Sequence, residues 1–314
     1  MIKTLECFGF NGKFCNWILV IFKSAYLYIG LNGKQVGYFK CSNGVRQGDS
    51  LSPFLFCLAE EVLSMGISNL VDSNQINLIK ASRNCFVPSH NLYTDDIMFF
   101  RRGDPNSLNA IANLLKDYAN CSGQYCNNAK SIIYAGGMIQ SRHQRLVDLI
   151  VFKISYPPFI YLGAHIFIGR PKSAHFQFVA DMIRIKLAAW KASLLFMAGR
   201  TQLVKSVILS MTVHYITVYN WPASTIKNIE TWMRNFIWSG NVDKRKLVTV
   251  KWKICCKNLK EGGLGIKSVK TFNDAANLHL CWRFLKDSKG RSKVLAARVR
   301  RNNHNIKYSI KSSI

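Results

Sequence analysis

The chain has 314 residues, of which 49% are hydrophobic and 12% aromatic, which is enough apolar surface to form folded cores and argues against wholesale disorder. Its 43 lysines and arginines against 16 aspartates and glutamates give a net charge of +27, which repels itself unless a polyanion neutralises it. Nucleic acid is therefore the expected partner. An anionic membrane and a merely soluble basic protein are the alternatives.

The N-terminal region carries no visible targeting segment. Its longest apolar run, residues 17–22, is too short to span a bilayer or to form the core of a secretion signal. We therefore expect a nuclear or cytoplasmic protein, neither secreted nor membrane-spanning, whose 10 cysteines are reduced thiols. The pairs Cys121 with Cys126 and Cys255 with Cys256 lack the companion ligands of a zinc site, so no structural metal is expected.

The first half of the chain predicts a helix, a hairpin and a second helix. The first helix begins at Ser52-Pro53, a good cap and first-turn pair, and carries an apolar stripe at Leu51, Leu55, Leu58 and Val62. Residues 91–100 place β-forming and aromatic residues on both sides of Thr94, Asp95 and Asp96, which predicts a β-hairpin with carboxylates at its tip. Helical spacing then returns, ends near Ser122-Gly123, and has its stripe at Leu108, Ile111, Leu115 and Tyr118.

From about Ala174 onward the sequence is typical of amphipathic helices in which tryptophans are interleaved with lysines and arginines. Apolar stripes predict these helices at Ile183, Leu187, Trp190, Leu194; at Leu203, Val207, Met211; at Ile229, Trp232, Phe236; and at Leu278, Trp282, Leu285. A glycine-rich turn at residues 262–265 precedes the last stripe. From Lys286 the chain is basic and poor in large apolar residues, so we expect a loosely ordered tail.

Asp95 and Asp96 carry the strongest chemical signal. Like charges this close repel each other unless a cation neutralises them. Oxygen ligands at such a tip suit Mg²⁺, which takes one or two carboxylates and completes its octahedron with water and substrate phosphates. The pair therefore indicates a metal site for phosphoryl transfer. A solvated Asp-Asp turn is the plainer alternative for the motif taken alone, because such dipeptides are common in turns.

A second motif precedes the hairpin. Residues 44–49, GVRQGD, place small residues and an amide directly before a helix N-terminus, where backbone can approach a nucleotide closely. This segment, followed by Tyr93-Thr94-Asp95-Asp96, resembles the second and third palm motifs of reverse transcriptases, specifically those of plant LINE-type non-LTR retrotransposons. Further segments, in matching order, resemble the next palm motif, the primer-gripping turn, the thumb and the connection: Ser122-Gly123-Gln124 with Asn127, Lys130 and Ser131; Tyr161-Leu162-Gly163; Ala198-Gly199-Arg200 with Lys205; Trp221-Pro222; Phe236-Ile237-Trp238; and Gly262-Gly263-Leu264-Gly265.

The resemblance implies an α+β fold, in which a partial polymerase palm of mixed helices and an antiparallel hairpin is followed by a mostly helical thumb and connection. The implied palm covers residues 1–172, the thumb 173–242, the connection 243–285 and the basic tail 286–314. The implied activity is RNA-directed DNA polymerisation, a nucleotidyl transfer that uses two Mg²⁺ ions, an RNA template, a DNA primer and dNTPs. Neither a membrane nor a small-molecule cofactor is implied.

The resemblance also assigns roles to single positions. Asp95 and Asp96 would be the catalytic metal ligands for the two Mg²⁺ ions, and Lys130 would neutralise or protonate the pyrophosphate. The incoming nucleotide and template base would lie against Gly44, Arg46, Gln47, Gly48 and Tyr93. The template-primer backbone would be contacted by Tyr161, Gly163, Arg200 and Lys205.

The chain departs from the family pattern at its start. Two-metal chemistry needs a further carboxylate from an earlier palm strand, Met1 falls almost on the boundary after that strand, and Glu6 is the nearest upstream carboxylate. Thr94 stands where the family usually has alanine, a change expected to do little damage because a β-branched residue suits a strand. We expect a family member that extends no primer by itself. The alternatives are an enzyme completed by a longer product or a second chain, a non-catalytic basic nucleic-acid-binding remnant, and a domesticated interaction protein.

Overall fold

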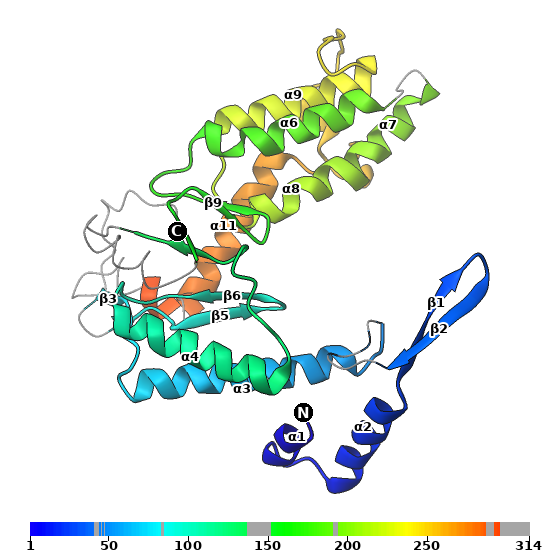
Figure 1. Ribbon diagram of the computed structural model, residues 1–314. Coiled ribbons are helices and arrows are strands. Elements are labelled where there is room, and N and C mark those ends of the chain that lie inside the picture. The colour runs from blue at the N-terminus through cyan, green and yellow to red at the C-terminus, as the bar shows by residue number, and fades with distance from the viewer. Residues whose placement is uncertain are drawn as a thin grey trace. The chain divides into compact units, whose positions relative to one another are not determined.

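The computed structural model describes residues 1–40, 44, 46, 48–82, 85–136, 152–190, 194–286 and 292–295. The chain divides into two compact units, Met1–Ser155 and Tyr156–Ile314, which are described separately (Figure 1). The boundaries expected from the sequence, after residues 172, 242 and 285, separate functional regions and stay predictions. Residues 286–314 belong to the expected tail, and most of them lie outside the described residues.

The first unit opens with two short helices and a two-stranded ribbon. Helix α1 (Ile2–Cys7) and helix α2 (Gly12–Ser24) contribute Leu5 and Ile18 to a small core. Strands β1 (Tyr26–Leu31) and β2 (Lys34–Lys40) then pair antiparallel. Their turn, Asn32-Gly33, has positive φ at both residues, the geometry that an Asn-Gly pair favours in hairpins. This ribbon was not among the elements expected from the sequence.

Helix α3 (Ser52–Asp72) is the longest helix of the first unit and starts where the sequence predicts. The capping prediction was wrong, because Leu51 occupies the N-cap position and Ser52 is the first helical residue. The Oδ1 of Asp49 accepts from the backbone N–H of Leu51 at 2.9 Å. Leu55 packs with α1 and α2, whereas Leu63 packs in a second cluster. By length and composition α3 is the one described helix that could cross a membrane, which is weak evidence for a single helix.

The rest of the first unit follows the predicted order of helix, hairpin and helix. Strands β3 (Lys80–Ser82) and β4 (Cys85–Phe86) pair antiparallel, as do β5 (His90–Tyr93) and β6 (Asp96–Phe99). Helix α4 (Pro105–Ser122) is capped by Asp104, whose Oδ1 accepts from the Ser107 N–H at 2.8 Å, and ends at Gly123. Strands β7 (Ile132–Tyr134) and β8 (Lys153–Ser155) pair in parallel.

The second unit is mostly helical after one short hairpin. Strands β9 (Phe159–Tyr161) and β10 (Ala164–Ile166) pair antiparallel. The helices that follow are α6 (Ser173–Ala189), α7 (Met197–Leu203), the π-helix η2 (Val204–Ile208), α8 (Leu209–Ile216), α9 (Ala223–Ser239), α10 (Trp252–Cys255), the 3₁₀ turn η3 (Leu259–Glu261) and α11 (Val269–Lys286). Figure 1 shows α6 and α9 running side by side along this unit. Together the two units confirm the expected α+β class with a helical second half.

The core of the second unit lies between α6, α9 and the α7–α8 region. Ile183 and Leu187 of α6 are fully buried against Ile229 and Phe236 of α9, as their spacing predicts. A buried amide ties α11 into this core, because Asn273 accepts from the Trp221 N–H at 3.0 Å and donates to the carbonyls of Ile216 and Tyr219. The core is thus closed by a polar hub as well as by apolar contacts.

Two predicted stripes do not coincide with the buried faces, and two others fail at one end: Val62 of α3 is 40% exposed, and Leu194, which lies beyond the end of α6, is 75% exposed. In the second stripe the fully buried residues are Val204 and Ile208, one position beyond Leu203 and Val207, where a π-helical stretch shifts the register. On α11 the stripe Leu278, Trp282 and Leu285 is 71%, 64% and 63% exposed. Helical spacing groups residues on one face, but it does not say which face the neighbouring helices cover.

Candidate functional site

Asp95 and Asp96 lie at the tip of the β5–β6 hairpin, as predicted. Tyr93 pairs with Asp96, so Thr94 and Asp95 form a two-residue turn. Thr94 has φ +50°, an uncommon conformation for a β-branched residue, and its hydroxyl donates to Asp95 Oδ1 at 3.0 Å. The expectation that Thr94 suits a strand was therefore wrong, since it sits in the turn and bears local backbone strain.

Both carboxylates at the tip are exposed, which leaves their oxygens available to a cation. Two carboxylates fit part of the coordination shell of one hydrated Mg²⁺, whereas a bridged pair of ions needs a further ligand from another element. Among the described residues, no group of three or more His, Cys, Asp or Glu side chains gathers at a common point. Glu6 is exposed on α1. The donor set thus suits a hydrated ion that also takes ligands from a substrate phosphate.

A histidine fixes the base of this hairpin to helix α3. The Nε2 of His90 lies 3.0 Å from the Ser64 hydroxyl, and its Nδ1 lies 2.8 Å from the hydroxyl of Ser89. Burial lowers the pKa of His90, which the charge of Glu61 opposes, and the ring is therefore neutral at physiological pH. The residue 44–49 segment leads directly into α3, and the base of the aspartate hairpin is bonded to the same helix. Both motifs that the sequence singled out are therefore connected to α3.

A buried carboxyl joins α3 to α4. The Tyr118 hydroxyl lies 3.4 Å from Oε1 of Glu60 and 3.1 Å from Oε1 of Gln124, while Oε2 of Glu60 is buried without a hydrogen-bond partner among the described residues. Burial raises the pKa of the Glu60 carboxyl and raises that of Tyr118 to about 12. Sequence analysis assigned Glu60 no role. Its spacing to Leu63 and Ile67, however, places it on the buried face of α3. This spacing could have shown from the sequence that the Glu60 carboxyl is buried.

The segment before α3 is described only in part. Gly44 and Gly48 both have positive φ, and Arg46 donates through Nη2 to the carbonyl of Tyr26 at 3.4 Å. Gln47 lies outside the described residues. The expectation that this segment lies against the incoming nucleotide and the template base therefore stays a prediction.

Lys130 is presented by a tight turn after α4. The Lys130 N–H donates to both the carbonyl and the Oδ1 of Asn127, at 3.1 and 3.2 Å, and the Ser131 hydroxyl donates to the same carbonyl. The lysine is exposed. Asn127, which the family resemblance included in this motif, thus shapes the turn that displays Lys130.

The predicted primer-gripping turn is a hairpin turn of the second unit. Leu162 and Gly163 have φ +48° and +77° between Tyr161 and Ala164, which pair across β9 and β10. A Cβ added at Gly163 would lie 3.7 Å from Nε2 of His214 on α8. The turn therefore lies beside α8, and its role toward a primer remains a prediction.

The two predicted backbone-contacting cations occupy different surroundings. Arg200 donates through Nε to the Leu195 carbonyl at 3.1 Å and through Nη1 to the Ile237 carbonyl at 3.3 Å, so part of its guanidinium stabilises the fold. Lys205 lines a cavity of about 530 Å³ with the glycine-rich turn, beside Gly265. A further lysine of the second unit, Lys186, is exposed on α6.

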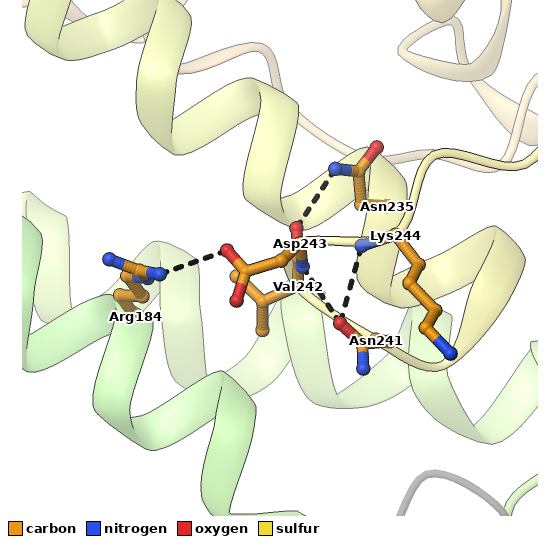
Figure 2. A network of polar contacts seen from close by, with 6 residues as sticks. All are labelled: Arg184, Asn235, Asn241, Val242, Asp243 and Lys244. Atoms are coloured by element: carbon orange, nitrogen blue, oxygen red, sulfur yellow. Dashed lines mark hydrogen bonds and ion pairs between the residues drawn. The ribbon is translucent and has the colours of Figure 1, made fainter.

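A basic loop after α9 was not singled out from the sequence. Asn235 donates to the Val242 carbonyl, Asn241 accepts from the N–H groups of Asp243 and Lys244, and Arg184 pairs with Asp243 at 3.0 Å (Figure 2). This network fixes the loop, and the cations that follow it, Lys244, Arg245 and Lys246, are all exposed. Three consecutive basic residues after an Asn-x-Asp turn would have allowed the sequence to identify this loop as a basic surface. The network adds an anchored basic surface to the second unit.

The hairpin turn carries the paired aspartates, and its base is bonded to the helix that follows the glycine-containing segment. A helical unit follows in the chain. This is the arrangement that the resemblance to a polymerase palm implies. A family model for "Reverse transcriptase (RNA-dependent DNA polymerase)" matches residues 1–166, just over half of the chain. The chain belongs to this family. The resemblance inferred from its motifs is thereby confirmed at the level of the reverse transcriptase.

Three relatives extend this comparison. A protein of Arabidopsis thaliana named "Putative ribonuclease H protein" is 32% identical over 109 residues, 35% of this chain and 18% of its own length. The "Transposon TX1 uncharacterized 149 kDa protein" of Xenopus laevis is 24% identical over 297 residues, 91% of this chain and 21% of its own length. An uncharacterized mitochondrial protein of Arabidopsis thaliana is 39% identical over 71 residues, 23% of this chain and 58% of its own length. The chain thus spans about a fifth of the first two relatives.

Proposed function

We propose that the chain is the palm and thumb portion of an RNA-directed DNA polymerase from a LINE-type non-LTR retrotransposon of a plant. The observation that carries the proposal is the Asp95-Asp96 pair on the β5–β6 turn, within the helix, hairpin and helix order of a reverse transcriptase palm. Relatedness over 91% of the chain to a transposon protein supports the retrotransposon origin. Two Arabidopsis relatives support the plant assignment. The nuclear or cytoplasmic location expected from the sequence stays part of the proposal.

In this proposal the chain's own residues bind an RNA template, a DNA primer and a dNTP. Asp95 and Asp96 would hold Mg²⁺, which supplies charge neutralisation at the reacting phosphates when bound. Lys130, displayed on its Asn127 turn, would deliver a proton or positive charge to the departing pyrophosphate. Arg46 and Gly48, with Gln47, would lie against the nucleotide.

Activity is tested by primer extension on an RNA template with Mg²⁺. We expect the 314-residue chain alone to extend no primer, because the described residues bring no third carboxylate to Asp95 and Asp96. The lack of one electrostatic contribution of this kind costs about 10²- to 10³-fold in rate. An upstream-extended version should extend the primer. It should lose this activity with Asp95→Asn but keep it with Asp117→Asn, an exposed aspartate on α4 that serves as the control.

Two outcomes would contradict this proposal. Extension by the bare chain that disappears in the Asp95→Asn variant would mean that another carboxylate completes the metal site, with Glu6 the first to examine. Equal activity of the Asp95→Asn and Asp117→Asn versions would remove the aspartate pair from the chemistry altogether.

The second candidate function is nucleic-acid binding without catalysis. It is favoured by the net charge of +27 and by the anchored basic loop of the second unit, Lys244 to Lys246. Duplex affinity should then fall with salt, with a log-log slope of about −0.9 per phosphate neutralised. Replacing Lys244 and Lys246 by glutamine should make this slope shallower by up to about 2, and an unchanged slope would exclude the loop as a contact.

A further inference from the structure

The β1–β2 ribbon exposes both of its faces. All seven residues of β2 and five of the six residues of β1 are exposed. A two-stranded ribbon has no core of its own, so apolar and aromatic side chains on it gain little from the fold. The most exposed of them is Tyr38, at 74%. These side chains are therefore available to a ligand.

The register sorts the ribbon's side chains into two chemically different faces. Residues that lie directly opposite each other share a face, and successive residues alternate. Tyr26 opposes Lys40 and Leu27 opposes Phe39, and the strands shift register at a bulge opposite Tyr28. Gly37, with φ +69°, supplies the left-handed residue of this bulge. One face, here named the tyrosine face, consists of Tyr26, Tyr28, Tyr38, Gln35 and Lys40; the other carries Leu27, Ile29, Leu31, Val36 and Phe39.

The tyrosine face presents aromatic rings in a stacked arrangement. The rings of Tyr28 and Tyr38 lie 6.1 Å apart with 30° between their planes. Tyr26, beside them on the same face, is 50% exposed. Exposed rings of this kind are the platforms on which successive unpaired bases stack, because every base has a π-face.

The electrostatics around this face select a polyanion. Between Glu6 and Asp49 the sequence contains no acidic residue, while its cations are Lys13, Lys23, Lys34, Lys40 and Arg46. Arg46 is held at the start of the ribbon by its bond to the Tyr26 carbonyl, and Lys40 lies directly opposite Tyr26. Two cations thus flank the aromatic platform, as expected for a strand whose bases stack while its phosphates are neutralised.

We propose that the tyrosine face binds an unpaired nucleic-acid strand, with bases stacked on Tyr28 and Tyr38 and phosphates near Lys40 and Arg46. A duplex hides its base faces, so this surface distinguishes unpaired from paired strands. The inference rests on the proposed function only in taking nucleic acid as the chain's ligand. It assigns the ribbon a contact of its own on Tyr28 and Tyr38, which shares only Arg46 with the residues proposed to lie against the nucleotide.

The test measures the affinity of the 314-residue chain for a labelled oligouridine of about 12 nucleotides, within the size range of stacking platforms. A probe of equal length without bases keeps the phosphates and removes the stacking partners. The variant Tyr28→Ala/Tyr38→Ala should bind oligouridine at least about tenfold more weakly and bind the abasic probe as before. The control Tyr125→Ala removes a tyrosine that is also 74% exposed and should bind oligouridine normally.

Three results would overturn the proposal. The double alanine variant could bind oligouridine with unchanged affinity, or it could lose as much affinity for the abasic probe as for oligouridine. It could also lose self-association instead of RNA affinity, which would make a second copy of the chain the partner. Tyr28→Phe/Tyr38→Phe keeps the rings and should bind like the parent chain, so a general folding defect of the alanine variant is recognised. If the ribbon proposal is wrong, oligouridine binding does not depend on the two tyrosines, while the primer-extension result is unaffected. If the proposed polymerase function is wrong, the upstream-extended version extends no primer, while oligouridine binding still depends on the two tyrosines. The two failures are therefore distinguishable.

Discussion

Replacement of Asn273 by alanine should destabilise the second unit more than any other single amide change on α11. The side chain is 1% exposed and makes three hydrogen bonds to backbone groups around the α8–α9 connection. Each contributes about 1 kcal/mol net, and buried backbone groups left without partners cost more, so the expected loss is about 3 to 5 kcal/mol. Asn277, one turn later, has an exposed bond to Asn220, and its replacement should cost under about 0.5 kcal/mol.

Urea unfolding followed by tryptophan fluorescence measures this difference. Of the 7 tryptophans only Trp17 precedes residue 156, so the other six report on the second unit. Both alanine variants gain the same helix propensity, which cancels in the comparison. Asn273→Asp should be at least as damaging as Asn273→Ala at pH 7, because a carboxylate would face two carbonyl oxygens. Equal midpoints for Asn273→Ala and Asn277→Ala would refute the reasoning.

Three further predictions concern single positions. Burial raises the pKa of the Glu60 carboxyl in the folded chain above its ordinary value of 4.5. The stability that the protonated carboxyl contributes is therefore present below pH 4.5 and is lost as the pH rises through the raised pKa. Glu60→Gln should increase the melting temperature at pH 7 but not at pH 4. A Cβ at Gly263 would lie 2.1 Å from the Lys257 carbonyl oxygen, so Gly263→Ala should lower the free energy of unfolding in urea by more than about 3 kcal/mol. Gly262→Ala has open space around the added Cβ but φ +79°, and should lower it by only about 1 kcal/mol. Equal losses for the two variants would contradict the geometry. Leu162→Asn places a residue that tolerates positive φ before Gly163 and should stabilise the second unit by about 1 kcal/mol by the same measurement, and any loss would argue against the turn as described.

The sequence by itself determined the aspartate hairpin, the helices on either side of it and the family, although it did not reveal the β1–β2 ribbon. The Asp95-Asp96 tip followed from β-forming residues on both sides of a polar triplet, and α4 ends at Gly123 as its spacing indicates. These features depend on residues near one another in the chain, where propensity and capping act. The ordered motifs likewise identified a reverse transcriptase, since their order is a property of the sequence.

Only the tertiary structure decided which partner each side chain meets. Spacing alone put Leu278 and Trp282 on one face of α11, yet the neighbouring helices cover the face that carries Asn273. The sequence presents Arg200 as a cation for nucleic acid, and only the fold shows that part of its guanidinium donates to the carbonyls of Leu195 and Ile237. Residues distant in the chain set these environments, and the burial and hydrogen bonding that result depend on packing between elements, which local periodicity does not encode.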